Sequence, residues 1–152
     1  MRKIELLLWV LIILTTLIKI FYNSIDSTVF TFIFIILLAQ FYMIFNFASI
    51  NNLRIRDIFK ESTYKKIEVK KIIIPVILGA FGFSPILVGT VFKRMHWKGS
   101  FEQLLFGLII ISIVLIATSV LFYKKDKNFF INIVLRIVVF GFIAVYFLNQ
   151  FS

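Results

Sequence analysis

Few residues of the types that carry out catalysis or bind metals occur in this chain. In 152 residues it has 17 Lys and Arg, seven Asp and Glu, one His and no Cys. Without cysteine, and with His96 alone, the sequence excludes ordinary Cys/His zinc sites and CxxC redox chemistry, and it disfavours thiol- or His-based nucleophilic catalysis. A Gly-rich phosphate-binding loop is also absent. We therefore expect no cofactor, no metal ion and no enzymatic activity.

Arg136 is the ionisable residue of greatest interest because it lies well inside a long apolar run. It is seven residues into the run 129–149, which corresponds to roughly 10 Å at 1.5 Å per residue. Lys19 is closer to the end of its own run, so its long side chain is expected to extend to the headgroup layer. A cation as deep as Arg136 needs a polar partner.

Neutral polar residues are the partners that the sequence offers to Arg136. Counted from the matching ends of the other apolar runs, four side chains lie at comparable depth: Asn46, Tyr42, Thr118 and Ser119. All acids lie at the edges of runs or in links: Glu5, Asp26, Asp57, Glu61, Glu68, Glu102 and Asp126. The sequence therefore predicts a neutral cluster around Arg136, with either a structural or a functional role, and disfavours proton-driven transport.

Five apolar runs position these residues and define the fold class. They cover residues 4–22, 28–49, 72–92, 104–123 and 129–149. About twenty residues of helix cross a hydrocarbon layer of roughly 30 Å, and helices satisfy their backbone groups internally. With 61% hydrophobic residues and twenty Phe, we predict an all-α polytopic membrane protein with five transmembrane helices in one bundle. The bulky residues 18–22 do not resemble a signal-peptidase site, so the first helix is expected to be retained.

The distribution of basic residues predicts the orientation. Seven cations lie between the second and third runs: Arg54, Arg56, Lys60, Lys65, Lys66, Lys70 and Lys71. With a cytoplasmic N-terminus, twelve Lys and Arg of the termini and links lie inside, and the positive-inside rule favours this orientation. The three on the outer side, Lys93, Arg94 and Lys98, do not fit the rule. The C-terminus is then outside, and the single domain 1–152 has one sizeable cytoplasmic segment, residues 50–71.

The basic segment 50–71 has two readings. Ile55, Ile58 and Phe59 recur at helical spacing among charged residues, which is typical of a short interfacial helix that binds anionic headgroups. A solvated linker that fixes topology explains the same charges. No folded module or aromatic platform accompanies them, so no nucleic-acid partner is expected.

The third run is the only one that contains proline. Pro85 lies mid-run, where it removes a backbone hydrogen bond to Phe81 and is expected to kink the helix. Gly82 and Gly89 flank it and allow a neighbouring helix to approach closely. This region is either a packing kink or a hinge that lines a cavity.

The link after the third run contains Lys93, His96, Trp97 and Gly99. These residues suit a sharp turn in the headgroup layer, or a loop that binds a partner. The string FKRMHWKGS at 92–100, followed by Gly107, resembles the helical hairpin of the GldL-type gliding-motility and type IX secretion membrane subunit, and of related small membrane proteins. The resemblance implies a bacterial cytoplasmic membrane and a periplasmic loop. Lys98 replaces that family's proline, and no glutamate follows Gly107, although the motor subunit has one there.

Two functions fit these observations. The first is a small non-enzymatic membrane protein that serves as a subunit or accessory component, with the bilayer and other membrane subunits or a second copy as partners. The alternative is a small carrier or channel that uses the kinked third helix and the cation of Arg136.

Overall fold

The computed structural model describes residues 1–22 and 25–151. These residues are almost entirely helical and contain no strand. The long elements are α1 (Arg2–Tyr22), α2 (Ile25–Ile50), α7 (Ser100–Phe122), α8 (Lys127–Leu148) and a composite third helix. That helix consists of α5 (Val69–Ile77), the π-helix η1 (Leu78–Phe83) and α6 (Ser84–Arg94). Short helices complete the chain: α3 (Ile55–Ile58), α4 (Glu61–Lys66) and the 3-10 turn η2 (Asn149–Phe151).

Five helices of the described chain are long and apolar enough to cross a membrane, which confirms that part of the prediction. The qualifying segments are Arg2–Phe21, Thr28–Ile50, Val69–Arg94, Ser100–Phe122 and Lys127–Leu148. They differ from the predicted runs by at most four residues at either end. Part of the first predicted link, residues 23 and 24, lies outside the described residues.

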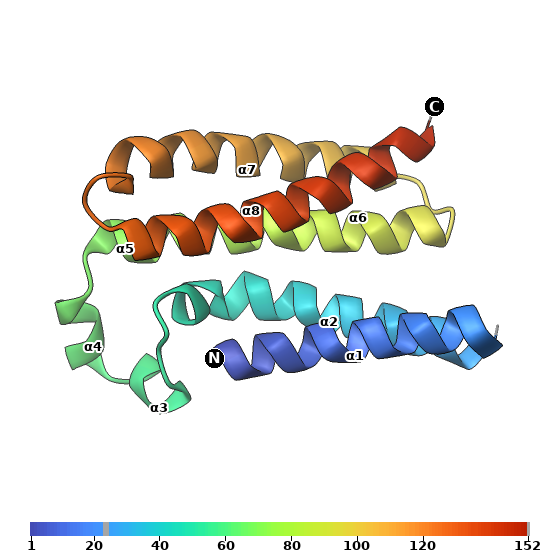
Figure 1. Ribbon diagram of the computed structural model, residues 1–152, viewed down its shortest axis with the longest axis horizontal. Coiled ribbons are helices and arrows are strands. Elements are labelled where there is room, and N and C mark those ends of the chain that lie inside the picture. Colours follow the sequence, from blue (N-terminus) through green and yellow to red (C-terminus); the bar gives the residue numbers. More distant parts are fainter. Residues whose placement is uncertain (23–24, 152) are drawn as a thin grey trace.

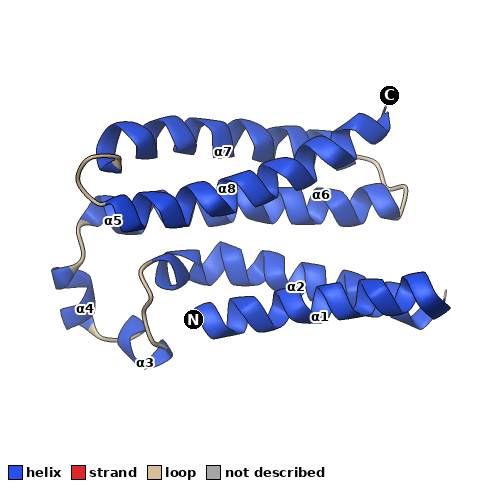
Figure 2. Cartoon of the chain, in the orientation of Figure 1, coloured by secondary structure: helices blue, strands red, loops and turns tan. Residues whose placement is uncertain are grey.

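The long helices lie roughly side by side and alternate in direction (Figure 1). The starts of α1, α5 and α8 lie at one end, called the Met1 end below. The ends of α1, α6 and α8 lie at the other, called the Lys19 end. α1 packs along α2, and α2 packs along the composite helix. α7 packs on η1, α6 and α8, while α3 and α4 extend beyond the Met1 end (Figure 2). Ile58 is the one buried residue of these short helices, and Phe59 is exposed.

The sequence predicts a kink at Pro85, and the structure has a π-helix immediately before the α-helical turn that contains this proline. Pro85 is the second residue of α6, where its missing N–H is tolerated. The N–H of Ser84 donates to the carbonyl of Gly79, five residues back, so one extra residue is accommodated in the widened turn. Proline thus shifts the hydrogen-bond register of the composite helix without ending it.

Glycines on the composite helix and on α7 bring neighbouring backbones together. A Cβ at Gly79 would lie 2.2 Å from the Tyr42 carbonyl oxygen on α2. A Cβ at Gly82 would lie 2.8 Å from Ile111 on α7, and one at Gly89 would lie 2.9 Å from Leu104. The predicted close approach at Gly82 and Gly89 is therefore present, and α7 is the helix that approaches. The contact at Gly79 is closer than those at Gly82 and Gly89, and it lets α2 pack directly against the composite helix.

An aromatic cluster fills the centre of the bundle. Tyr42, Phe83 and Phe140 come from α2, η1 and α8 and are almost fully buried. The Phe83 and Phe140 rings stack with centroids 4.0 Å apart, and Tyr42 meets each ring edge-on at 5.2 and 5.1 Å. Trp9 of α1 packs on Phe140 at 5.9 Å. This cluster positions the Tyr42 hydroxyl and the Trp9 indole for the polar site described next.

Candidate functional site

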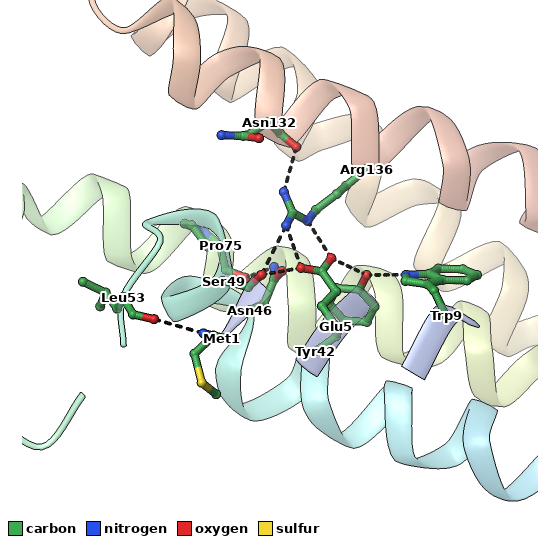
Figure 3. Close-up of polar contacts among 10 residues, drawn as sticks. All are labelled: Met1, Glu5, Trp9, Tyr42, Asn46, Ser49, Leu53, Pro75, Asn132 and Arg136. Atoms are coloured by element: carbon green, nitrogen blue, oxygen red, sulfur yellow. Dashed lines mark hydrogen bonds and ion pairs between the residues drawn. The ribbon is translucent and has the colours of Figure 1, made fainter. Parts of the chain in front are cut away.

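A buried ion pair joins the first long helix to the last. The Arg136 guanidinium donates to both carboxylate oxygens of Glu5, from Nε to Oε1 at 3.0 Å and from Nη2 to Oε2 at 2.7 Å. Only 14% of the Arg136 side chain and 8% of the Glu5 side chain are exposed. Two parallel hydrogen bonds make this the strong, orientation-specific form of the pair. In Figure 3 the two side chains point toward each other from α1 and α8.

Neutral donors and acceptors complete the shell around this pair. The Tyr42 hydroxyl donates to Glu5 Oε1 at 2.7 Å, and the Ser49 hydroxyl donates to Glu5 Oε2. The Trp9 indole N–H donates to the Tyr42 hydroxyl at 3.1 Å. On the other side, Arg136 Nη1 donates to the Asn132 carbonyl at 3.2 Å (Figure 3). The Glu5 carboxylate therefore accepts hydrogen bonds from four donors and is fully satisfied.

Helical spacing explains how the chain assembles this shell. Glu5 and Trp9 are four residues apart on α1, so both side chains project from one face. Tyr42 and Ser49 are seven residues apart on α2, two turns along the same face. The Met1 ammonium donates to the Leu53 carbonyl at 3.1 Å, which ties the start of α1 to the segment after α2. Two helical spacings, one on α1 and one on α2, thus bring these side chains together.

The predicted neutral cluster around Arg136 is wrong in its central feature, because a carboxylate is present. Glu5 was expected at a membrane edge. Arg136 lies nine residues after the start of α8, whereas Glu5 lies three residues after the start of α1. At 1.5 Å per residue, α8 therefore begins about 9 Å further out than α1. In the sequence, the depth of each residue is measured from the end of its own helix. Because α1 and α8 do not begin at the same level, this measure places Glu5 and Arg136 at different depths although they are in contact.

The structure separates the other predicted members of the cluster. Tyr42 reaches Arg136 only through Glu5. Asn46 donates to the Pro75 carbonyl at 2.6 Å, so it supports the junction before η1. Thr118 and Ser119 bond to carbonyls of their own helix, at 2.7 and 2.8 Å, as hydroxyls in apolar helices commonly do. Ser49, which donates to Glu5, is the neutral residue that the prediction missed.

A second ion pair lies at the Met1 end, between the composite helix and α8. Lys71 Nζ is 2.5 Å from Asp126 Oδ2, and Asp126 also caps α8 by accepting from the Phe129 N–H at 3.0 Å. The hydrogen bond from Lys71, followed by the backbone bond from Phe129, lowers the pKa of Asp126. Both side chains are partly exposed, so this pair is screened by solvent.

The predicted loop at 93–99 closes α6 with a left-handed residue. The N–H of Trp97 donates to the Phe92 carbonyl and that of His96 to the Lys93 carbonyl, which is the Schellman arrangement. His96 has a φ of 57° at the position where glycine is usual. Gly99 follows with a φ of 85°, consistent with the sharp reversal expected of it. Trp97 is half exposed and packs on Phe92 at 5.2 Å.

Two cavities open beside α1, and Trp9 lines both. The larger has a volume of about 530 Å³ and extends toward the Lys19 end. The smaller has a volume of about 330 Å³ and is lined by Glu5, Arg136 and Asn132. The ion pair thus borders an open space as well as the protein interior.

Residues 1–22 and 25–151 contain no group of three potential metal-binding side chains. Comparison with family models, with curated proteins and with solved structures finds no match for this chain.

Proposed function

We propose that the chain is a non-enzymatic integral membrane protein that acts as a subunit or accessory component of a membrane complex. The observation that carries this proposal is that the bundle's buried charges neutralise each other. Glu5 and Arg136 share two hydrogen bonds and hold α1 to α8. Charges used in this way stabilise an arrangement of helices, whereas a catalytic acid or base needs a substrate within hydrogen-bond reach.

Orientation and location belong to the same proposal. The charge distribution favours a cytoplasmic Met1 end, with α3 and α4 at the inner surface and the C-terminus outside. The basic segment 50–71 then attracts anionic headgroups on that side. The resemblance of residues 92–107 to bacterial membrane subunits favours a bacterial cytoplasmic membrane.

α1 is the helix that we propose as the partner-binding surface. In its most apolar stretch of 18 residues only 6% of the residues are buried inside the bundle, compared with 44% in the corresponding stretch of the composite helix. α1 packs along α2 and contacts α8 through the Trp9–Phe140 ring pair and the polar shell of Glu5. A helix so little covered can accept a helix of another subunit, or α1 of a second copy, without rearrangement of the core.

Cysteine cross-linking in native membranes tests this surface, because the chain has no cysteine. Leu14 on α1 is 49% exposed and Ile116 on α7 is 67% exposed. With a short bifunctional reagent, we expect Leu14→Cys to give a discrete adduct, whose mass identifies a second copy or another subunit. Ile116→Cys is the control and should give none. Absence of an adduct at both positions, together with a monomeric mass in mild detergent, would overturn the proposal.

A small carrier is the second candidate, and the two cavities that meet at Trp9 favour it. They approach from different directions along α1, as expected of a path blocked by one side chain. Because Glu5 neutralises Arg136, this guanidinium attracts an anionic substrate less strongly than a free cation would. Solute flux through liposomes that contain a homogeneous preparation would favour this candidate over the first.

A further inference from the structure

The larger cavity has the chemical character of a site for an amphiphile. Its volume of about 530 Å³ lies within the range of about 300–1,000 Å³ that is usual for ligand sites. Trp9, Ile35 and Leu87 contribute to an apolar lining from three different elements. Arg94 and Lys19 come from the C-terminal ends of α6 and α1 and line the same cavity. One space therefore combines an apolar interior with two cations at the Lys19 end.

The two cations are held beside the cavity by different means. The Arg94 guanidinium lies over the Phe147 ring of α8, with 5.5 Å between Cζ and the ring centroid, and Phe147 also lines the cavity. Lys19 is half-buried near the end of α1. Among the side chains that the structure describes, no carboxylate lies within ion-pair distance of either cation. Positive charge at this mouth is complementary to an anionic headgroup.

We propose that this cavity binds one acyl chain of an anionic phospholipid from the surrounding bilayer. The acyl chain extends along Ile35 and Leu87 toward Trp9, and the headgroup phosphate lies between Lys19 and Arg94. This site is independent of the proposed partner surface, because the cavity lies between α1, α2, α6 and α8 and not on the outer face of α1. A lipid there fills the space between α1 and α8 that protein side chains leave open.

Fluorescence quenching provides a direct test because the chain has only two tryptophans. In a Trp97→Phe background, Trp9 in the cavity is the sole indole. Purified protein in mild detergent is titrated with phosphatidylglycerol brominated on its acyl chains, with the matching brominated phosphatidylcholine, and with brominated fatty acid. We expect saturable quenching that needs much less phosphatidylglycerol than either of the other lipids.

Charge variants test the mouth of the cavity. Lys19→Gln with Arg94→Gln should reduce the preference for phosphatidylglycerol by roughly 30-fold, on the order of fivefold for each cation. Lys98→Gln is the matched control, since Lys98 is exposed in the loop at the same end but does not line the cavity. It should leave the titration unchanged.

A cavity-filling variant separates this site from the smaller cavity, which Trp9 also lines. Thr16 is exposed on α1 and lines only the larger cavity, so Thr16→Phe should abolish quenching without removing a charge. Quenching that persists in Thr16→Phe, equal quenching by phosphatidylcholine, or quenching by fatty acid alone would each overturn the proposal. None of these results bears on cross-linking at Leu14, so the two proposals can fail separately.

Discussion

Replacement of either charge of the Glu5–Arg136 pair should destabilise the bundle strongly. Glu5→Met leaves the Arg136 guanidinium largely buried with two neutral acceptors, and Arg136→Met leaves a buried carboxylate with two hydroxyl donors. Removal of one partner from a buried pair costs about 3–5 kcal/mol, because the remaining charge is uncompensated. Exposed fractions of 8% and 14% place this pair in that class. We expect each single variant to lose about that much unfolding free energy.

The double variant Glu5→Met/Arg136→Met should be more stable than either single variant. The double variant leaves no buried charge. Its main cost is the loss of the two hydrogen bonds that the Tyr42 and Ser49 hydroxyls donate to Glu5, about 1 kcal/mol for each bond. The two single losses together exceed the loss of the double variant, so the double-mutant cycle should give a coupling of at least about 4 kcal/mol. Neutralisation of both charges is expected to rescue the fold in large part.

Reversible unfolding in mixed micelles of mild detergent and dodecyl sulfate, followed by tryptophan fluorescence, measures these differences. The control is the Glu61–Lys65 pair of α4, whose side chains are 83% and 75% exposed. The same pair of methionine substitutions there should leave unfolding unchanged. An additive cycle at Glu5 and Arg136, or single variants as stable as the parent, would refute the account of this pair.

Three further predictions concern individual contacts. His96→Gly should raise the unfolding free energy by about 1 kcal/mol, because glycine adopts the left-handed φ of 57° without strain; a melting temperature no higher than that of the parent contradicts this. Gly79→Ala should lower it by about 1–3 kcal/mol through overpacking, since the new Cβ would meet a backbone oxygen at 2.2 Å. Gly141→Ala, whose nearest contact would be 3.7 Å away, is the control and should differ little from the parent. In the folded protein, Lys71 and the cap lower the pKa of Asp126 below its ordinary value of 3.8. The ionised Asp126 carboxylate therefore contributes its full stabilisation above pH 3.8, and this stabilisation is lost as the pH falls through the lower folded-state pKa. Asp126→Asn should therefore reduce the loss of stability measured below about pH 4, and an unchanged acid profile argues against the Lys71 pair.

The sequence was sufficient for the helices but not for the charge pairing. Apolar runs of about twenty residues have one main structural solution in lipid, so the five long helices follow from composition and length. Pro85 and its neighbouring glycines distinguish the third helix in the sequence, but the π-helix that precedes Pro85 is a register change that single residues do not specify, and the kink itself stays a prediction.

Glu5 shows why the polar site could not be derived in the same way. Its partner Arg136 is 131 residues away in the chain, so no local spacing connects them. The relative offset of α1 and α8 decides which residues meet, and that offset depends on packing of the whole bundle. One signal was available: Arg136 needed a polar partner, and Glu5, although near the start of its run, is the only acid that lies within any of the five predicted runs.

Labelling of single cysteines from the two sides of the membrane measures whether the long apolar helices cross a bilayer. Ser62 before the composite helix and Lys98 after it are both exposed. We predict that a membrane-impermeant maleimide labels Lys98→Cys in intact cells, and that it labels Ser62→Cys only after the membrane is permeabilised. Labelling of both cysteines from the same side would contradict a crossing by Val69–Arg94 and with it the proposed topology.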